Sequence, residues 1–174
     1  MAIDKIQASS INLADTFAFT GSVTGAGGGK VVQIAHSTLS PATNSTSGNS
    51  FVTAGHKVDI TPTSASNRIL IMLNGGTGYV ANSVTRMHTA LYRDISGGSG
   101  ATNITNANEG FETFYDGNAD SAAPHSAVHV DTTYNTTSLI EYKLYYRNHN
   151  NSGLVYQNVS WAGNWSLIAM EYQT

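Results

Sequence analysis

The stretch SLIEYKLYYR, residues 138–147, carries the clearest structural pattern in the chain. Apolar and aromatic side chains alternate in it with charged ones. A β-strand places successive side chains on opposite faces of its sheet. One face therefore receives the apolar set, Ile140, Tyr142, Leu144 and Tyr146, and the other receives Glu141, Lys143 and Arg147. This alternation predicts a strand with one face in the core and one in solvent.

Residues 69–73, ILIML, are apolar at every position and predict a strand that is covered on both faces. The following Asn74-Gly75-Gly76 is expected to end it. Turn-forming clusters separate shorter runs that predict the remaining strands, at residues 30–36, 51–61, 84–93, 111–115, 126–130 and 165–172. No stretch has a helical period of useful length. About eight short antiparallel strands predict an all-β fold, a β-sandwich of jelly-roll type.

The composition favours strands and turns and excludes several kinds of function. Charged residues make up 11% of the 174 residues, against roughly 25% in ordinary domains. The absence of cysteine removes disulfides, thiolate metal ligands and cysteine nucleophiles. With a net charge of -3 and no Lys/Arg cluster, we expect no nucleic-acid partner. Apolar runs are too short for membrane insertion.

Residues 1–29 differ from the rest and predict an attachment arm that ends in a glycine-rich hinge. Apolar residues are scattered through the arm, too sparsely to bury one another, so we expect them to dock on another surface. They are Ile3, Ile6, Ile11, Leu13, Phe17 and Phe19. Residues 30–174 are expected to form the β-sandwich head.

Four segments in order carry a resemblance to a known family. They are residues 10–26 (SINLADTFAFTGSVTGA), 60–71 (ITPTSASNRILI), 138–144 (SLIEYKL) and 165–172 (WSLIAMEY). Together they resemble small tail-fibre and head-fibre proteins of tailed phages, especially phages of marine bacteria. The chain departs from that pattern at Asn67-Arg68, at Tyr172 and in the lack of a long shaft before the head, which favours a short spike, a head fibre or a fibre-tip subunit.

The resemblance implies a homotrimeric jelly-roll head on a virion, assembled in the host cytoplasm. Its arm would bind other virion proteins of the tail or head, and its head would recognise a host surface glycan or outer-membrane protein. One alternative is a head fibre or decoration protein without receptor binding. Another is a free-standing, monomeric, lectin-like carbohydrate-binding module.

The motifs of catalysis are missing, so we expect no enzyme and no cofactor. Gly-x-Ser-x-Gly and any compact Ser/His/Asp pattern are absent. The carboxylates Glu109 and Glu112 stand beside aromatic residues, so a glycosidase-like cleft remains an alternative interpretation. A loop or strand edge is the simpler interpretation. The residues proposed for receptor or glycan binding combine aromatic rings with polar groups: Phe114, Tyr115, Asp116, Asn118, Tyr156 and Trp161.

We expect no metal site. His125 and His129 would share a face of a strand but lie roughly 13 Å apart, too far for one ion. Histidines in general are expected at the surface. The neighbours Tyr145 and Tyr146 must point to opposite faces, so one enters the core while the other meets a second subunit or solvent.

Overall fold

The computed structural model describes residues 30–39, 44–81, 85–96, 100–116, 121–149, 153–157, 159 and 163–173. Within these ranges the regular structure is all β, and no helix is long and apolar enough to cross a membrane. The strands are β1 (Val31–Leu39), β2 (Asn44–Thr46), β3 (Val52–Ile60), β4 (Arg68–Ala81), β5 (Thr85–Ile95), β6 (Thr102–Asn103), β7 (Glu112–Asp116), β8 (Ser121–Asp131), β9 (Ile140–Asn148), β10 (Leu154–Gln157) and β11 (Trp165–Tyr172). The predicted attachment arm, residues 1–29, lies outside the described residues.

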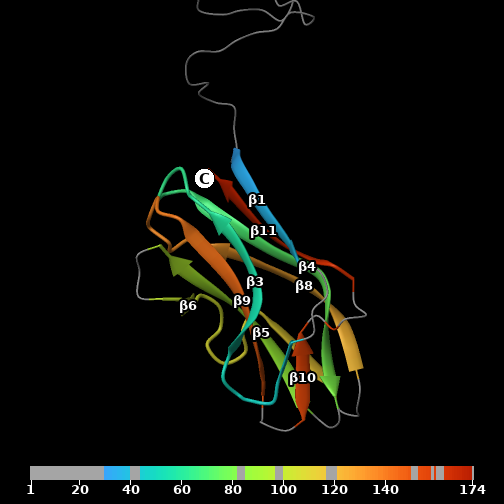
Figure 1. Ribbon diagram of the computed structural model, residues 1–174. Coiled ribbons are helices and arrows are strands. Elements are labelled where there is room, and N and C mark those ends of the chain that lie inside the picture. The colour runs from blue at the N-terminus through green and yellow to red at the C-terminus, as the bar shows by residue number, and fades with distance from the viewer. Residues whose placement is uncertain are drawn as a thin grey trace, which may run out of the picture.

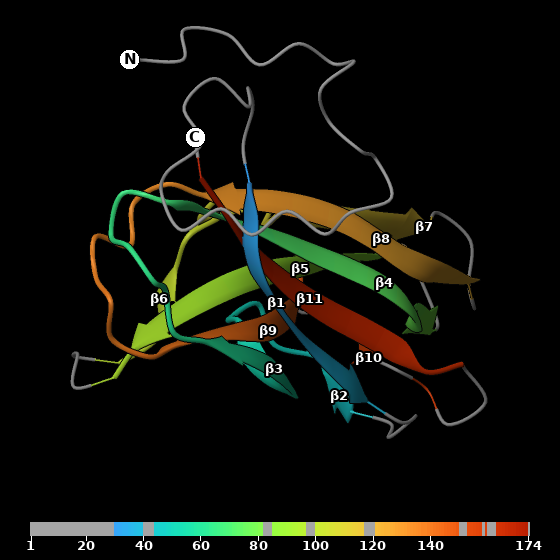
Figure 2. The same ribbon diagram turned by 90° about the horizontal axis from the view of Figure 1, so that it is seen from above.

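Two antiparallel sheets form the molecule, and they pack face to face (Figures 1 and 2). Sheet A has the order β1-β11-β4-β8, and β10 and β2 extend it beside the last residues of β4. Sheet B has the order β3-β9-β5, with β6 and β7 both paired to β5. The predicted β-sandwich is therefore confirmed.

The longer strands alternate between the two sheets along most of the chain. Strands β1, β4, β8 and β11 lie in sheet A, whereas β3, β5, β7 and β9 lie in sheet B. This gives a four-stranded layer, β1-β11-β4-β8, opposite a second layer, β3-β9-β5-β7. Two such interleaved four-stranded sheets have the strand order of a jelly roll.

The sequence-based boundaries were wrong at the centre of sheet A. The strand predicted at residues 69–73 continues to Ala81, because Gly75 and Gly76 adopt φ values of 86° and 61° and shift the register with β8 rather than end the strand. A Cβ at Gly76 would lie 2.9 Å from Cβ of Trp165, so glycine permits that indole to pack on the backbone. Strands β2, β6 and β10 were not predicted.

Alternating side chains from both sheets fill the core. The predicted inward set of β9 is buried as expected, and Val58 and Ile60 of β3 are buried beside it. Trp165, Tyr142 and Tyr146 are the largest fully buried side chains. Strand β4 behaves differently from the prediction: Ile69, Ile71 and Leu73 are buried, but Leu70 and Met72 point to the outer face and stay half-buried. The outer face of sheet A is thus not covered by the described residues.

Candidate functional site

Two adjacent rows of side chains cross the outer face of sheet A from β1 to β8. The first row contains Ile34, Met170, Leu70 and Val130, and the second contains His36, Ile168, Met72 and Val128. Residues directly opposite one another in antiparallel strands point to the same side of the sheet. All except His36 are apolar, and we call these seven residues the apolar face.

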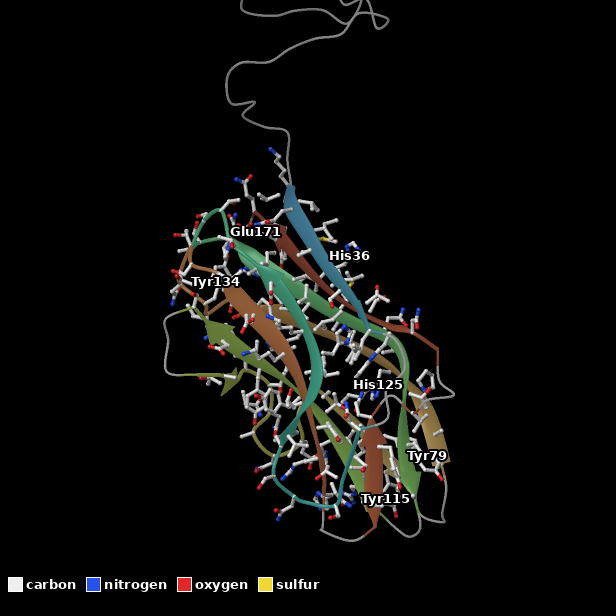
Figure 3. All side chains as sticks on the ribbon, viewed as in Figure 1. His36, Tyr79, Tyr115, His125, Tyr134 and Glu171 are labelled. Carbon is white, nitrogen blue, oxygen red and sulfur yellow. The ribbon has the colours of Figure 1, made fainter. Side chains whose placement is uncertain are left out.

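The apolar face is exposed to solvent in the single chain. Val128 is 64% exposed, Ile34 58% and Val130 38%. The next row along the strands is polar, and consists of Thr38, Ser166, Asn74 and Ser126. Contiguous exposed apolar surface with a polar border is the anatomy of a protein–protein interface. Figure 3 places His36 on β1, the strand at one edge of this face.

The outer face of sheet B is charged and aromatic instead. Lys143 pairs with Asp94 at 2.7 Å and with Glu141 at 2.8 Å, and Lys57 pairs with Glu141 as well. Hydrogen bonds from Lys143 and then Lys57 hold the pKa of Glu141 below its ordinary value. These pairs are partly exposed to solvent, so they add little to stability but order the polar face.

Aromatic rings lie beside these charges. The rings of Tyr92 and Tyr145 stack with their centroids 3.9 Å apart and an interplanar angle of 24°. Phe51 meets Tyr92 edge-on at 6.1 Å, and the guanidinium of Arg147 lies 5.0 Å from the Phe51 ring centre. As expected from their adjacency, Tyr146 enters the core while Tyr145 is on the outer face.

A buried carboxylate fixes one end of the sandwich. Glu171 of β11 is fully buried and accepts hydrogen bonds from the side chains of Gln33 and Asn67, both at 2.6 Å, and from the Thr63 backbone. Burial raises the pKa of Glu171, but these donors outweigh it and lower that pKa. Tyr134 lies at the same end (Figure 3) and donates to the Asn67 carbonyl oxygen at 2.8 Å. The network ties the β3–β4 turn to the last strand.

A second buried carboxylate joins the two sheets. Asp131 at the end of β8 accepts hydrogen bonds from Arg93 of β5 at 2.8 Å and from the Tyr142 hydroxyl of β9 at 2.9 Å. Burial works to raise the pKa of Asp131, whereas the Thr133 N–H, Arg93 and Tyr142 lower it below its ordinary value. This contact holds sheet A against sheet B.

Three histidines are buried, which contradicts the expectation that they lie at the surface: His56, His88 and His125. The ring of His125 lies inside the sandwich (Figure 3), where Nδ1 pairs with Glu112, Nε2 is 2.8 Å from Nε2 of Gln157, and the ring stacks on Trp165. Burial opposes ionisation of Glu112, but the hydrogen bond from His125 lowers its pKa overall.

The three residues of the receptor-binding prediction whose side chains are described lie in two different sheets. Phe114 packs half-buried against the core, and Tyr115 is 55% exposed next to Arg86 in sheet B. Tyr156 belongs to sheet A, where its ring lies 5.4 Å from that of Tyr79. The side chain of Asp116 lies outside the described residues, as do Asn118 and Trp161. The proposal for these residues therefore stays a prediction.

The carboxylates Glu109 and Glu112 do not converge on solvent. Glu109 is exposed in a turn, whereas Glu112 faces His125 in the interior. Among the described residues, no three His, Asp or Glu side chains gather closely enough to hold a metal ion. His125 and His129 both lie in strand β8 and not in a helix, as the sequence predicted.

Sequence reasoning missed the apolar face as a whole. A signal was present in residues 165–172, where Trp165, Leu167 and Ala169 alternate with Ile168 and Met170, so that both faces of the strand are largely apolar. The four-strand register that brings Ile34 and Val128 into the same rows depends on the fold and has no local signature.

No model of a known protein family and no curated protein sequence matches the chain. A comparison with solved structures finds a chain in the structure of infectious bursal disease virus Gx strain. The two share 11% sequence identity with a TM-score of 0.42, over 82% of this chain and 37% of that one. The chain thus spans little more than a third of the length of that viral chain.

Proposed function

We propose that the chain forms the head of a homotrimeric structural protein of a bacteriophage virion, a short fibre or spike. The observation that carries this proposal is the apolar face of sheet A. A lone chain exposes it to solvent, at a free-energy cost that association removes. The occupant is a second copy of the same chain, and three copies turn their apolar faces toward a common axis.

The absence of charge on the apolar face favours another copy as the partner. None of the eight positions in the two rows is Asp, Glu, Lys or Arg, so identical faces meet without like-charge repulsion. A stable interface buries about 800 Å² per partner. The apolar rows supply its centre, and the polar row from Thr38 to Ser126 supplies part of its rim.

Replacing Val128 by Glu tests the interface. Its side chain is 64% exposed, so the fold of one chain tolerates the change, whereas a trimer would bring three carboxylates into an apolar contact. We expect Val128→Glu to reduce the mass in solution from that of a trimer to that of a single chain. The matched control is Leu139→Glu, at an exposed apolar residue outside the apolar face. Equal masses for both variants would overturn the interface.

The resemblance of the four sequence segments and the apolar residues of the predicted arm support a location on the virion. In this proposal the arm binds a tail or head protein, and the head projects to the host surface. Gold-labelled antibody against residues 30–174 should decorate a defined structure on purified particles. Particles that remain undecorated would contradict the proposal.

Receptor binding is tested apart from virion location. Purified head in excess should compete with particles for host adsorption if it recognises a glycan or outer-membrane protein. Decorated particles whose adsorption is unaffected would favour the decoration protein instead, and a monomer that binds sugar would favour the lectin-like module.

A further inference from the structure

A hollow opens on the outer face of sheet B, beside the stacked tyrosines. It has a volume of about 290 Å³ and is lined by Thr53, Gly55, His56, Lys57, Lys143 and Tyr145. The pairing of β3 with β9 shifts register between Thr53 and Lys57. Gly55 lies in that irregularity with a φ of 72°, and a Cβ there would have no atom within 4 Å. The bulge and the missing side chain therefore create the hollow.

Tyr145 is held in place at the wall of this hollow. Its ring stacks on Tyr92 at 3.9 Å, and Tyr92 is supported in turn by Phe51. A ring that is fixed before a ligand arrives loses little conformational freedom on binding. Tyr145 therefore offers a rigid, flat apolar surface with a hydroxyl at its end.

Ion pairs hold the polar groups around the hollow. Lys57 contacts Asp59 at 3.1 Å and also Glu141, while Lys143 contacts Asp94 at 2.7 Å and Glu141. The two lining lysines are thus paired with three carboxylates that lie outside the lining, so neither lysine offers an unpaired ammonium group to a ligand. Ammonium donors, carboxylate acceptors and the Thr53 hydroxyl lie within a short distance of one another.

We propose that this hollow binds a neutral saccharide. A pyranose ring has an apolar C–H face that fits an aromatic ring, and hydroxyl groups that both donate and accept hydrogen bonds. The mixed rim matches those hydroxyls, whereas an anionic sugar would have to displace carboxylates that already pair with both lysines. Ligand sites run from about 300 to 1,000 Å³, so at about 290 Å³ the hollow suits a ligand as small as a single sugar ring. The inference deepens the proposed function, because it names the ligand class and the place where the head recognises a surface.

The test uses the full chain and saturation-transfer NMR with glucose, galactose, mannose, N-acetylglucosamine and N-acetylneuraminic acid as separate probes. We expect binding of at least one neutral sugar at millimolar affinity, as an open site for so small a ligand implies. Tyr145→Ala should weaken that binding about tenfold, while Tyr145→Phe, which keeps the ring, should retain most of it. Tyr172→Ala removes a tyrosine of sheet A that does not line the hollow and should leave binding unchanged.

Three results would overturn the inference. They are binding of no neutral sugar in the panel, binding of N-acetylneuraminic acid alone, and undiminished binding by Tyr145→Ala. Light scattering on the same samples reports the assembly separately. A trimer that binds no sugar would rule out the saccharide site and leave the proposed assembly intact. A monomer that binds sugar would support the saccharide site and contradict the proposed assembly.

Discussion

The carboxylate of Glu171 in β11 accepts hydrogen bonds from both the backbone N–H and the hydroxyl of Thr63, each at 2.9 Å and 108 residues apart in sequence. The contact joins the β3–β4 turn to the end of the chain. Glu171→Gln places amide hydrogens where donors now converge. Because hydrogen bonds to charged groups contribute about 1.5–3 kcal/mol each, we expect the free energy of unfolding to fall by about 2–4 kcal/mol in urea titrations.

Glu109→Gln is the control for this change, because Glu109 is exposed and its loss should alter stability by less than about 0.5 kcal/mol. If the Glu171→Gln and Glu109→Gln variants have the same unfolding midpoint, the network around Glu171 does not stabilise the fold as described.

The ion pair between Arg93 and Asp131 links the sheets, and its loss should be costly. The carboxylate is 1% exposed and the guanidinium 15%. Arg93→Met leaves a buried carboxylate without its cation, and we expect a loss of about 2–4 kcal/mol in stability. Arg86→Met in the same strand removes an exposed cation beside Tyr115 and should cost about 1 kcal/mol or less. An unfolding midpoint that is lower for Arg86→Met than for Arg93→Met would refute the role of the Arg93–Asp131 pair in joining the sheets.

Two glycines with nearly the same positive φ should respond differently to alanine. Gly110 and Gly55 have φ values of 70° and 72°, so both substitutions carry a strain of about 1–2 kcal/mol. A Cβ at Gly110 would also lie 2.0 Å from the carbonyl oxygen of Thr89, whereas at Gly55 the space is open. We expect Gly110→Ala to lower stability by about 3 kcal/mol or more. Comparable losses in thermal unfolding would contradict this packing.

Stability should fall as the pH drops below neutrality. Burial lowers the pKa values of His56, His88 and His129 below their ordinary 6.5. Below that pH the unfolded chain binds protons that the folded chain does not, so the histidines' contribution is complete above about pH 6.5 and is lost on acidification. Urea midpoints at one protein concentration should decrease from pH 8 to pH 5.5.

His88→Gln should reduce that decrease. A midpoint that stays constant over this range in the unsubstituted protein would show that the histidines titrate alike in both states. Below about pH 4.5, protonation of Asp131 and Glu171 adds a further loss, because their folded pKa values are also lowered.

Local periodicity was enough to predict most of the sandwich. The alternation in residues 138–147 predicted β9 and its inward face, since a strand buried on one side leaves that pattern in any fold. It failed at Gly75 and Gly76, where the glycines make a bulge for Trp165 instead of a turn. The difference depends on a residue about 90 positions away, which no local pattern contains.

The candidate surfaces were harder to foresee than the strands. His56 stands in register with Val58 and Ile60 on the buried face of β3, so its burial was readable from the spacing. The apolar face and the hollow beside Tyr145 were not, because they depend on the register of several strands and on a bulge. Tyr145 was singled out only as the partner of the buried Tyr146.

The most direct test of the account is the mass of the full-length protein in solution, measured by light scattering. The chain weighs 18.4 kDa, so the account predicts three times that mass, 55.2 kDa. A monomer of 18.4 kDa that keeps its β-sheet circular dichroism would show that the apolar face stays open, and would contradict the trimeric fibre head.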